Sequence, residues 1–502
     1  MKVRFAAAVT AITAIILGLL VVSGTQTAMA AEERDGVLRT SGSQILDTEG
    51  EHTIKAVSWF GLETETCSPH GLWQVSLDSG LQSIKTAGFN TIRLPYANEC
   101  LHRDTVTGVN ASVNPTLVSM SPQQLMDTVI TEADRYGLDI ILDRHRPGVG
   151  GQSELWYTAQ ISEQQWINDW KMLANRYLNQ TNVIGADLHN EPHGAACWGC
   201  GSPAYDWKAA AERAGNAVLA ENPNLLIIVE GTEKNNSGTK TTWWGGGLWH
   251  AEQYPVQLSN PTKLVYSVHD YPSTIWNQSW FSDPNYPNNL ISVWDENWGY
   301  LQKEGIAPVF VGEFGTKYET MSDKQWLSEL VQYLDGNSMS WAFWAYNPNS
   351  GDTGGVVGND WSTYETDKLS ALSDILTPTG TTPTPTSTPT IIPDPTGTPT
   401  VAPTPSGTPT PQNPEPHPSE SPTAPTTTPS PTSTPPTAPP VTNGNMTVRW
   451  KLQSGWDQGY VAEMTVTGEA TTWQVSWTDP TATRIMNAWG MKCDLTGNTI
   501  TC

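Results

Sequence analysis

The segment Val183-Ile184-Gly185-Ala186-Asp187-Leu188-His189-Asn190-Glu191-Pro192 joins an apolar run to an abrupt polar end. The apolar part is typical of a strand that is buried on both faces of a parallel sheet. Pro192 cannot extend a ladder of backbone hydrogen bonds, so the pattern predicts a turn there, with Glu191 at the C-terminal end of the strand. A second apolar run, at 308–315, also closes on a glutamate, Glu313, set between glycines. Two such glutamates in one domain predict a pair of carboxylates that act together.

Strand-like runs alternate with helical patterns throughout residues 33–376. The strand-like runs lie at 53–59, 89–94, 138–143, 183–192, 225–230, 264–269, 308–315 and 340–344. Helical patterns are clearest at 73–87, 121–136, 163–178, 206–221 and 323–335. This alternation predicts an α/β domain with the (β/α)₈ barrel (TIM barrel) architecture. An open doubly wound sheet is the alternative, but the first strand lacks a glycine-rich phosphate loop and no Walker-type motif occurs.

The charge balance and the N-terminus indicate where the protein acts. The chain has 502 residues, 50 acidic and 26 basic, with a formal net charge of -24. Such a surface repels phosphate backbones and anionic membranes, so nucleic acids and lipids are disfavoured as partners. Residues 1–31 have a basic start, an apolar run and the small-residue site Ala28-Met29-Ala30, which predicts a cleaved signal peptide and a secreted, extracellular monomer. An uncleaved membrane anchor is the alternative, because the apolar run approaches the length needed to span a bilayer.

The six cysteines form an even set, as expected for an oxidising compartment. Fifteen pairings are open from sequence alone. We favour local pairing, which joins Cys67 to Cys100, Cys197 to Cys200, and Cys493 to Cys502. The Cys197-Trp198-Gly199-Cys200 motif could also be half of a zinc site or a redox pair. Because the chain has no second such motif, a disulfide that pins a loop is the better interpretation.

The C-terminal third changes composition twice. Residues 377–442 are almost entirely Pro, Thr and Ser. Such a segment cannot bury a core, so we expect a disordered, extended and semi-rigid linker. Residues 443–502 regain alternating aromatic and β-branched residues, which predicts a small all-β unit.

The ends of the predicted barrel strands carry an unusual concentration of polar and aromatic residues. Chemistry in such barrels takes place where the C-terminal ends of the strands meet. The residues there are Arg93, Asp143, His145, Asn190, Glu191, Glu230, His269, Tyr271, Glu313 and Trp344. Each alone has an ordinary structural interpretation, since a single strand-end glutamate is more often a helix cap or an ion-pair partner. Their convergence on one face predicts an active site.

The two glutamates suit the cleavage of a glycosidic bond. This reaction needs a protonated acid at the leaving oxygen and a carboxylate facing the anomeric carbon. Two identical residues differ in role only if their surroundings separate their pKa values. We expect Arg93 and Tyr271 to keep one glutamate ionised, and a less charged pocket beside Asn190 to keep the other protonated. Sugar rings would stack on flat aromatic faces, for which the candidates are Trp344, Trp73, Trp244 and Trp280.

No metal or organic cofactor is required by this chemistry. The spacing of His189 and His193 around a glutamate is loosely like the zinc-protease motif. That motif needs glutamate directly after the first histidine on an unbroken helix. Here Asn190 takes that place and Pro192 disrupts the turn, so we expect no metal site.

The motifs together resemble the secreted, actinobacterial type of family 5 endoglucanase, over about residues 37–376. The matching motifs are Ile92-Arg93-Leu94-Pro95-Tyr96, Leu142-Asp143-Arg144-His145, His189-Asn190-Glu191-Pro192, His269-Asp270-Tyr271, Gly312-Glu313-Phe314-Gly315 and Trp341-Ala342-Phe343-Trp344. The resemblance implies a retaining endo-β-1,4-glucanase acting on cellulose, with Glu191 at the acid/base position and Glu313 at that of the nucleophile. It also implies that the cleavage subsite is lined by Arg93, His145, Asn190, His269, Tyr271 and Trp344.

The tail resembles the first half of a family 2 cellulose-binding module. The matching segments include Gln453-Ser454-Gly455-Trp456 and Asn487-Ala488-Trp489. By this resemblance Trp456 and Trp489 stack on a cellulose surface. The chain ends before such a module would be complete, so we expect a partial module with open sheet edges.

Two alternatives to a cellulase are compatible with the sequence. The same catalytic pair could serve an endo-hydrolase of mannan, xylan or mixed-linkage glucan. The chain could instead be a non-catalytic polysaccharide-binding protein. The presence of both glutamates argues against the second alternative, because a lectin has no use for a proton donor opposite a nucleophile.

Overall fold

A computed structural model describes residues 37–376 and, within the C-terminal region, a set of strands. These strands are β11 (Thr447–Trp456), β12 (Gly459–Thr467), β13 (Ser476–Thr478), β14 (Asp494–Thr496) and β15 (Thr499–Thr501). The chain divides into two compact units, 1–388 and 389–502. The predicted signal peptide and linker lie outside the described residues, as do Trp489, Cys493 and Cys502.

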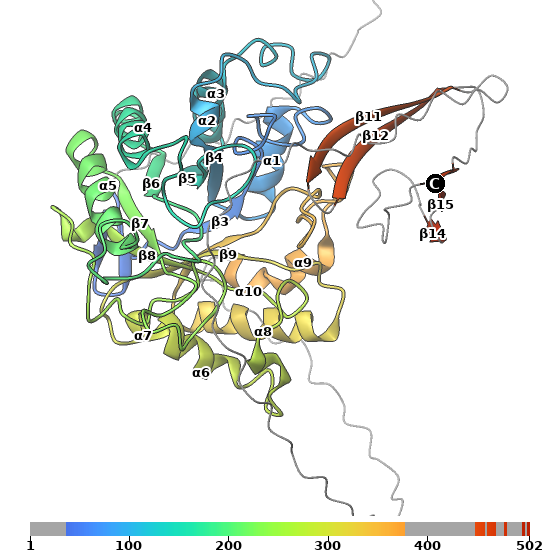
Figure 1. Ribbon diagram of the computed structural model, residues 1–502. Coiled ribbons are helices and arrows are strands. Elements are labelled where there is room, and N and C mark those ends of the chain that lie inside the picture. The colour runs from blue at the N-terminus through green and yellow to red at the C-terminus, as the bar shows by residue number, and fades with distance from the viewer. Residues whose placement is uncertain are drawn as a thin grey trace, which may run out of the picture. The chain divides into compact units, whose positions relative to one another are not determined.

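A closed parallel barrel forms the first unit (Figure 1). Its strands are β3 (Lys55–Ser58), β4 (Thr91–Ala97), β5 (Asp139–Arg146), β6 (Val183–Asp187), β7 (Leu226–Glu230), β8 (Leu264–His269), β9 (Val309–Phe314) and β10 (Ser340–Phe343). Each pairs in parallel with its neighbours in chain order, and β10 closes the ring on β3. The (β/α)₈ prediction is confirmed, and closure rules out the open doubly wound sheet.

The predicted helices form at the expected places. They are α1 (Leu77–Thr86), α3 (Pro122–Arg135), α4 (Glu163–Arg176), α5 (Trp207–Glu221) and α8 (Met321–Gly336). Each begins after a capping side chain that accepts a backbone N–H of the first turn, supplied by Ser76, Ser121, Ser162, Asp206 and Thr320. Such caps satisfy backbone donors that have no partner within the helix. The starts of these helices are therefore local properties of the sequence.

The helical stretch after β8 was not predicted. It runs through α6 (Leu290–Trp294), a π turn (Asp295–Gly299) and α7 (Tyr300–Lys303). Trp294 and Trp298 are both buried there. The pieces are too short for a helical period to be read from sequence, and burial of the two indoles against the barrel stabilises them. Further short helices are α2 (Asn98–Leu101), α9 (Thr366–Ala371) and α10 (Ser373–Leu376), with 3₁₀ turns at Pro261–Lys263 and Ser279–Ser282.

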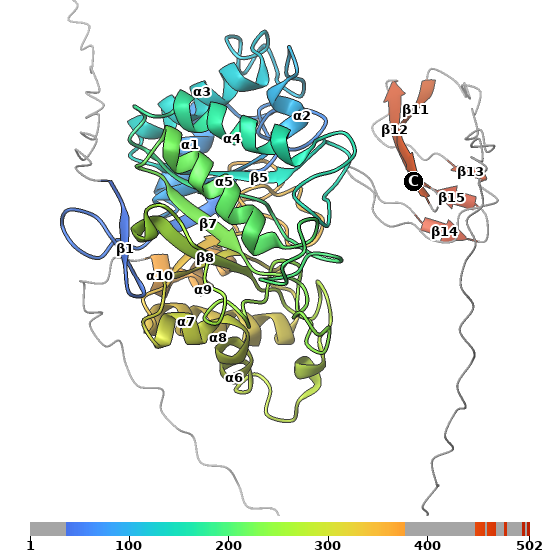
Figure 2. The ribbon, with the colours of Figure 1, turned by 60° about the vertical axis from the view of Figure 1, so that its left-hand side comes forward.

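Two apolar layers hold the barrel. The larger one lies between the strands and the helices, and the smaller one fills the barrel interior. The interior layer includes Leu38 and Ile45, which flank or belong to the hairpin of β1 (Arg39–Ser41) and β2 (Gln44–Leu46), drawn in blue in Figure 2. Near the N-terminal strand ends, Nζ of Lys263 donates to the carbonyl oxygens of Leu38, at 2.5 Å, and Asn224, at 3.0 Å. The candidate site residues lie at the opposite, C-terminal ends of the strands.

Disulfides join Cys67 to Cys100 and Cys197 to Cys200. The first links the loop after β3 to α2, and its sulfurs pack with Ala97 and Val149. Both pairs match the local pairing expected from the sequence. The Cys197–Cys200 motif is thus engaged as a disulfide in the structure and not as a zinc ligand pair.

The C-terminal unit is all-β where it is described. Strands β11 and β12 form an antiparallel hairpin, and β15 pairs in antiparallel fashion with β13 and β14. Throughout the described part of the chain, the helices are all too short or too polar to cross a membrane.

Candidate active site

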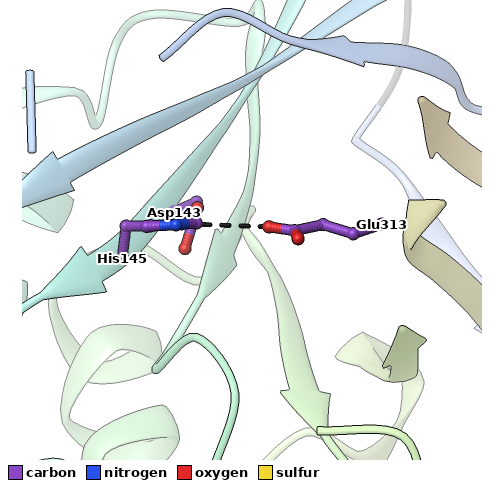
Figure 3. Close-up of side chains that lie close together, drawn as sticks. All are labelled: Asp143, His145 and Glu313. Atoms are coloured by element: carbon purple, nitrogen blue, oxygen red, sulfur yellow. Dashed lines mark hydrogen bonds and ion pairs between the residues drawn. The ribbon is translucent and has the colours of Figure 1, made fainter. Parts of the chain in front are cut away.

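Neighbouring strand ends bring the polar residues together. Asp143 on β5 is the register partner of Asp187 on β6, and His269 on β8 is the partner of Glu313 on β9. Figure 3 shows Asp143 and His145 on one side of the site, pointing toward Glu313 on the other. Tyr271 lies in the loop after β8, and Asn190 and Glu191 lie in the loop after β6. The predicted site residues from β4 to β9 therefore converge at one face, as the barrel topology requires.

Arg93 is the electrostatic centre of the site. It is fully buried, and its guanidinium contacts four carboxylates: Asp143 at 3.1 Å, Asp187 at 3.0 Å, Glu230 at 3.3 Å and Glu313 at 2.5 Å. Burial alone would lower the pKa of Arg93, but these carboxylates raise it well above its usual value. The arginine therefore remains a cation throughout the pH range in which the protein is folded.

One cation cannot compensate four buried carboxylates. Burial raises the pKa of Asp143 to about 8, and that of Asp187 and Glu230 to about 7, against the lowering effect of Arg93 or His269. Protons are thus retained among the strand-end carboxyl groups near neutral pH. The sequence assigned no role to Asp143 or Glu230 and overlooked Asp187. A buried arginine in an apolar strand was the available signal, because it requires buried counter-charges.

Glu313 has the surroundings expected of an ionised carboxylate. Besides Arg93, it accepts a hydrogen bond at Oε2 from the Tyr271 hydroxyl at 2.7 Å. Nδ1 of His269 lies 3.4 Å from the same oxygen, and Nδ1 of His145 lies 3.9 Å from Oε1. His145 is held by Asp143, whose Oδ2 is 2.7 Å from Nδ1. The expected contacts of Arg93 and Tyr271 with one of the two glutamates are present.

Glu191 lies beyond the strand that was predicted to carry it. Strand β6 ends at Asp187, and Glu191 adopts a left-handed backbone conformation with φ of 57°. For a residue other than glycine this costs on the order of 1–3 kcal/mol, which the surroundings must offset. Its backbone N–H donates to Oε2 of Glu230 at 2.7 Å, which fixes this conformation.

The surroundings of the Glu191 carboxyl differ from the expected uncharged pocket. Oε1 lies 2.9 Å from Nδ1 of His269. Burial acts to raise the pKa of Glu191, but the hydrogen bond and charge of His269 have the larger effect. The pKa of Glu191 therefore lies below its usual value. Burial likewise lowers the pKa of His269, and Glu230, Glu313 and Glu191 raise it well above 6.5. The two directions favour a cationic His269 beside an ionised Glu191, which differs from the less charged pocket beside Asn190 that the sequence predicted.

The two glutamates are close enough to act on one bond. Single atoms of Glu191, His269 and Glu313 all lie within 4.8 Å of one another, and so do atoms of Asp143, His145 and Glu313. Either trio has donor types that could bind a cation. However, Glu313 belongs to both trios and is already bonded to Arg93 and Tyr271. The positive charge of this site is supplied by the protein itself.

Asn190 completes the polar floor. Its Oδ1 accepts a hydrogen bond from Nη2 of Arg93 at 2.8 Å, which orients the amide. Its Nδ2 is buried and has no hydrogen-bond partner within the described residues. A buried amide donor without a partner is costly unless a ligand satisfies it. The amide is thus positioned to donate to a ligand oxygen.

Aromatic rings flank the carboxylates. Trp344 stacks with His145, with ring centroids 5.1 Å apart, and with Phe60 at 5.4 Å. His70 links Phe60 to Trp73, with centroid distances of 5.3 and 5.2 Å. Trp73 and Trp344 therefore belong to one row of rings that begins at His145. Trp73 and Trp344 are partly exposed, and their flat rings suit the apolar faces of sugar rings.

The remaining tryptophan candidates lie elsewhere. Trp244 is 44% exposed and stacks on His193 with ring centroids 3.9 Å apart. Nδ1 of His193 lies 2.7 Å from the carbonyl oxygen of Glu191, so this ring is tied to the Glu191 side of the site. Trp280 lies in the 3₁₀ turn after β8, where its aromatic neighbours are Phe281 and Trp243, the latter from the segment between β7 and β8. Trp456 ends β11 in the other unit.

Comparison with known families explains this arrangement. The model of the cellulase family, glycosyl hydrolase family 5, matches residues 46–350. This chain belongs to that family. It is therefore a glycoside hydrolase, and the barrel with its strand-end carboxylates is a cellulase-family catalytic domain.

Named relatives and solved structures support the same family. An endoglucanase of Paenibacillus polymyxa is 46% identical over 372 residues, which cover 73% of this cellulase and 94% of the relative. The major extracellular endoglucanase of Xanthomonas campestris pv. campestris is 38% identical over 365 residues, 71% of this chain and 75% of that one. The solved catalytic domain of the latter superposes with a TM-score of 0.65 and 38% identity, covering 68% of this chain and 99% of that domain. An endocellulase of Pyrococcus horikoshii in complex with cellotetraose gives a TM-score of 0.64 at 38% identity, with coverage of 68% and 99%.

Proposed function

We propose that this cellulase hydrolyses internal β-1,4-glucosidic bonds by double displacement, with Glu313 as the nucleophile and Glu191 as the acid/base. The proximity of the two carboxylates, within 4.8 Å of each other and of His269, carries the proposal. Retaining glycosidases have carboxyl groups about 5 Å apart, whereas inverting enzymes leave room for a water molecule. The family and its endoglucanase relatives make the activity that of an endo-β-1,4-glucanase.

The different hydrogen-bond partners of the two glutamates support the two proposed roles. Arg93 and Tyr271 hold the Glu313 carboxylate, so its electron pair is available to attack the anomeric carbon. Glu191 shares a hydrogen bond with His269, which supplies the proton that Glu191 passes to the leaving oxygen. In the second step Glu191 takes a proton from water, and the water oxygen displaces Glu313 from the sugar.

The polar and aromatic side chains around Glu191 and Glu313 suggest the contacts with substrate. The Nδ2 donor of Asn190 would bond a hydroxyl group of the sugar next to the cleaved bond. Trp344 and Trp73 would stack on sugar rings on the His145 side, and Trp244 on the Glu191 side. Arg93, His145, His269 and Tyr271 would shape the subsite through the two glutamates. A role for Trp280 would require substrate that extends to the loop after β8.

The other parts of the chain would serve secretion and anchoring. We propose residues 1–31 as a signal peptide, 33–376 as a catalytic domain of the actinobacterial endoglucanase type, 377–442 as a linker and 443–502 as sequence of a family 2 cellulose-binding module. The antiparallel strands β11 to β15 and the extracellular Xanthomonas relative support this arrangement. The enzyme would act outside the cell as a monomer, and the linker would raise the local concentration of cellulose.

Substrate class and mechanism are tested with the full chain and its Glu313→Gln variant. Both are incubated with carboxymethyl-cellulose, galactomannan and xylan, while viscosity and new reducing ends are followed. We expect a rapid loss of viscosity on the cellulose derivative, and a loss of activity by several orders of magnitude in the variant. Activity confined to mannan or xylan would replace the substrate assignment. Unchanged activity in Glu313→Gln would refute the nucleophile.

A further inference from the structure

Glu230 occupies a position that the proposed reaction does not yet use. It is the last residue of β7 and is fully buried. Its side chain is therefore enclosed at the C-terminal end of the barrel. A buried carboxylate is costly unless each oxygen has a partner.

Both oxygens of Glu230 contact groups that set the geometry of Glu191. Oε2 accepts the backbone N–H of Glu191 at 2.7 Å, 39 residues away in sequence. Oε1 lies 3.4 Å from Nε2 of His269 and 3.3 Å from Nη2 of Arg93. His269 in turn bonds the Glu191 carboxyl through Nδ1 at 2.9 Å. One carboxylate thus holds Glu191 directly through its backbone and indirectly through the imidazole.

The space beside the Glu230 carboxylate admits no side chain at the neighbouring position. Gly245 lies against it, and a Cβ there would sit 2.5 Å from Oε2 of Glu230 and 3.3 Å from Cα of Glu191. Gly245 has φ of 69°, a conformation that side-chain-bearing residues rarely adopt. The loop that carries Gly245 therefore closes over Glu230 and Glu191 at the same point.

We propose that Glu230 is a positioning residue that aligns Glu191 and His269 for proton donation to the leaving oxygen. The inference rests on the proposed role of Glu191 as the acid. In this proposal, Glu230 stabilises the left-handed backbone conformation of Glu191 and orients the imidazole of His269. Its loss would impair the protonation of the leaving group more than the attack of Glu313.

Substrates with different leaving groups distinguish a loss of proton donation from a loss of nucleophilic attack. Phenyl β-cellobioside has a poor leaving group that needs protonation, and 2,4-dinitrophenyl β-cellobioside has one that departs without it. In the full-length enzyme, we expect Glu230→Gln to lower kcat/KM about 30-fold for the phenyl glycoside and less than about 3-fold for the dinitrophenyl glycoside. A general loss of structure would lower both values by the same factor.

Asp187→Asn is the matched control. Asp187 is also a buried strand-end carboxylate, and its Oδ2 is bonded to Arg93 at 3.0 Å. Its Oδ1 has no hydrogen-bond partner among the described residues, so neither oxygen holds Glu191. We expect this variant to lower kcat/KM for both glycosides by similar factors. Equal losses for the two glycosides in Glu230→Gln, or none, would overturn the proposal.

Two further variants make every outcome decisive. If Glu230→Gln does not fold by circular dichroism, Gly245→Ala displaces the same carboxylate from the loop side and must show the same selective loss. Glu191→Gln, measured in parallel, tests the underlying role. If Glu191→Gln lowers kcat/KM equally for the two glycosides, the acid assignment of Glu191 fails. If Glu191→Gln is selective and Glu230→Gln lowers both values equally, only the positioning role of Glu230 is wrong.

Discussion

Nδ1 of His269 lies 2.9 Å from Oε1 of Glu191, and each group favours the charged form of the other: the pKa of His269 is raised and that of Glu191 is lowered. Both shifts follow from charge. His269 faces several carboxylates, which together outweigh the cost of burying its cation. A proton on His269 is available to Glu191 without leaving the site.

Replacement of His269 by Asn should raise the pKa of Glu191. Burial already raises that pKa, and the variant removes the hydrogen bond and cation that lower it. We expect Glu191 to remain protonated to higher pH, and kcat to fall about 10²-fold because proton delivery is lost. The measurement is a ¹³C NMR titration of labelled carboxyl groups, with Glu191→Gln used to assign the signal. A pKa that stays the same or falls would contradict the proton assignment.

Tyr271→Phe should lower kcat without unfolding the protein. The variant deletes the 2.7 Å hydrogen bond to Oε2 of Glu313, and hydrogen bonds to charged groups contribute about 1.5–3 kcal/mol. We expect kcat on cellotetraose to fall about 10- to 100-fold. Tyr333→Phe is the control, because its hydroxyl bonds Asp295 at 2.6 Å, on elements away from the strand ends. Equal effects of the two variants would refute a specific role for Tyr271.

Trp344→Ala should weaken substrate binding. The indole is partly exposed and stacks with His145 and Phe60, so its removal deletes the flat face beside the carboxylates. We expect KM for cellotetraose to rise about tenfold, and Trp344→Phe to restore part of the loss because an aromatic face returns. Michaelis–Menten kinetics on both variants check this. A phenylalanine variant as impaired as the alanine variant would argue against stacking.

Stability should decline between about pH 6.5 and 8. The pKa is about 8 for Asp143 and about 7 for Asp187 and Glu230 in the folded protein. These three carboxyl groups therefore bind protons more tightly in the folded state than in the unfolded state. A raised carboxyl pKa stabilises the fold below its unfolded value, and this contribution is lost as pH rises through the folded value. His145 and His70, whose pKa values are lowered to about 3 and 4, oppose this trend only below about pH 6.5.

Calorimetry of the full chain measures this decline. We expect the Tm of the catalytic domain to fall by a few degrees over that interval, and the fall to be smaller in Asp187→Asn. A Tm that rises across the interval would show that these carboxyl groups are ionised in the folded protein.

The two described disulfides should differ in their contribution to stability. Cys67 and Cys100 are 33 residues apart, whereas Cys197 and Cys200 are separated by three. A cross-link restricts the unfolded chain more when it closes a longer loop, with about 2–4 kcal/mol typical for loops of this size. We expect the double variant Cys67→Ser, Cys100→Ser to lower Tm by several degrees, and the Cys197→Ser, Cys200→Ser variant to lower it less. Denaturant unfolding checks the order, which equal losses would contradict.

Periodicity along the chain was sufficient to predict the barrel. The apolar runs and the capping residues Ser121 and Ser162 act over a few neighbours, so the sequence displays them directly. Because parallel strands of a barrel all end at one face, the convergence of Glu191 and Glu313 also followed from the order of elements. The short helical pieces around Trp294 and Trp298 escaped prediction because their stability comes from burial against distant residues.

What the sequence by itself determined is therefore the architecture and the identity of the paired glutamates. The tertiary structure decided how charge is distributed between them. The carboxylates around Arg93, the contact of His269 with Glu191 and the hydrogen bond from the Glu191 backbone to Glu230 depend on distances between residues far apart in sequence. Electrostatic energies vary with those distances and with burial, and strand register and barrel closure set both.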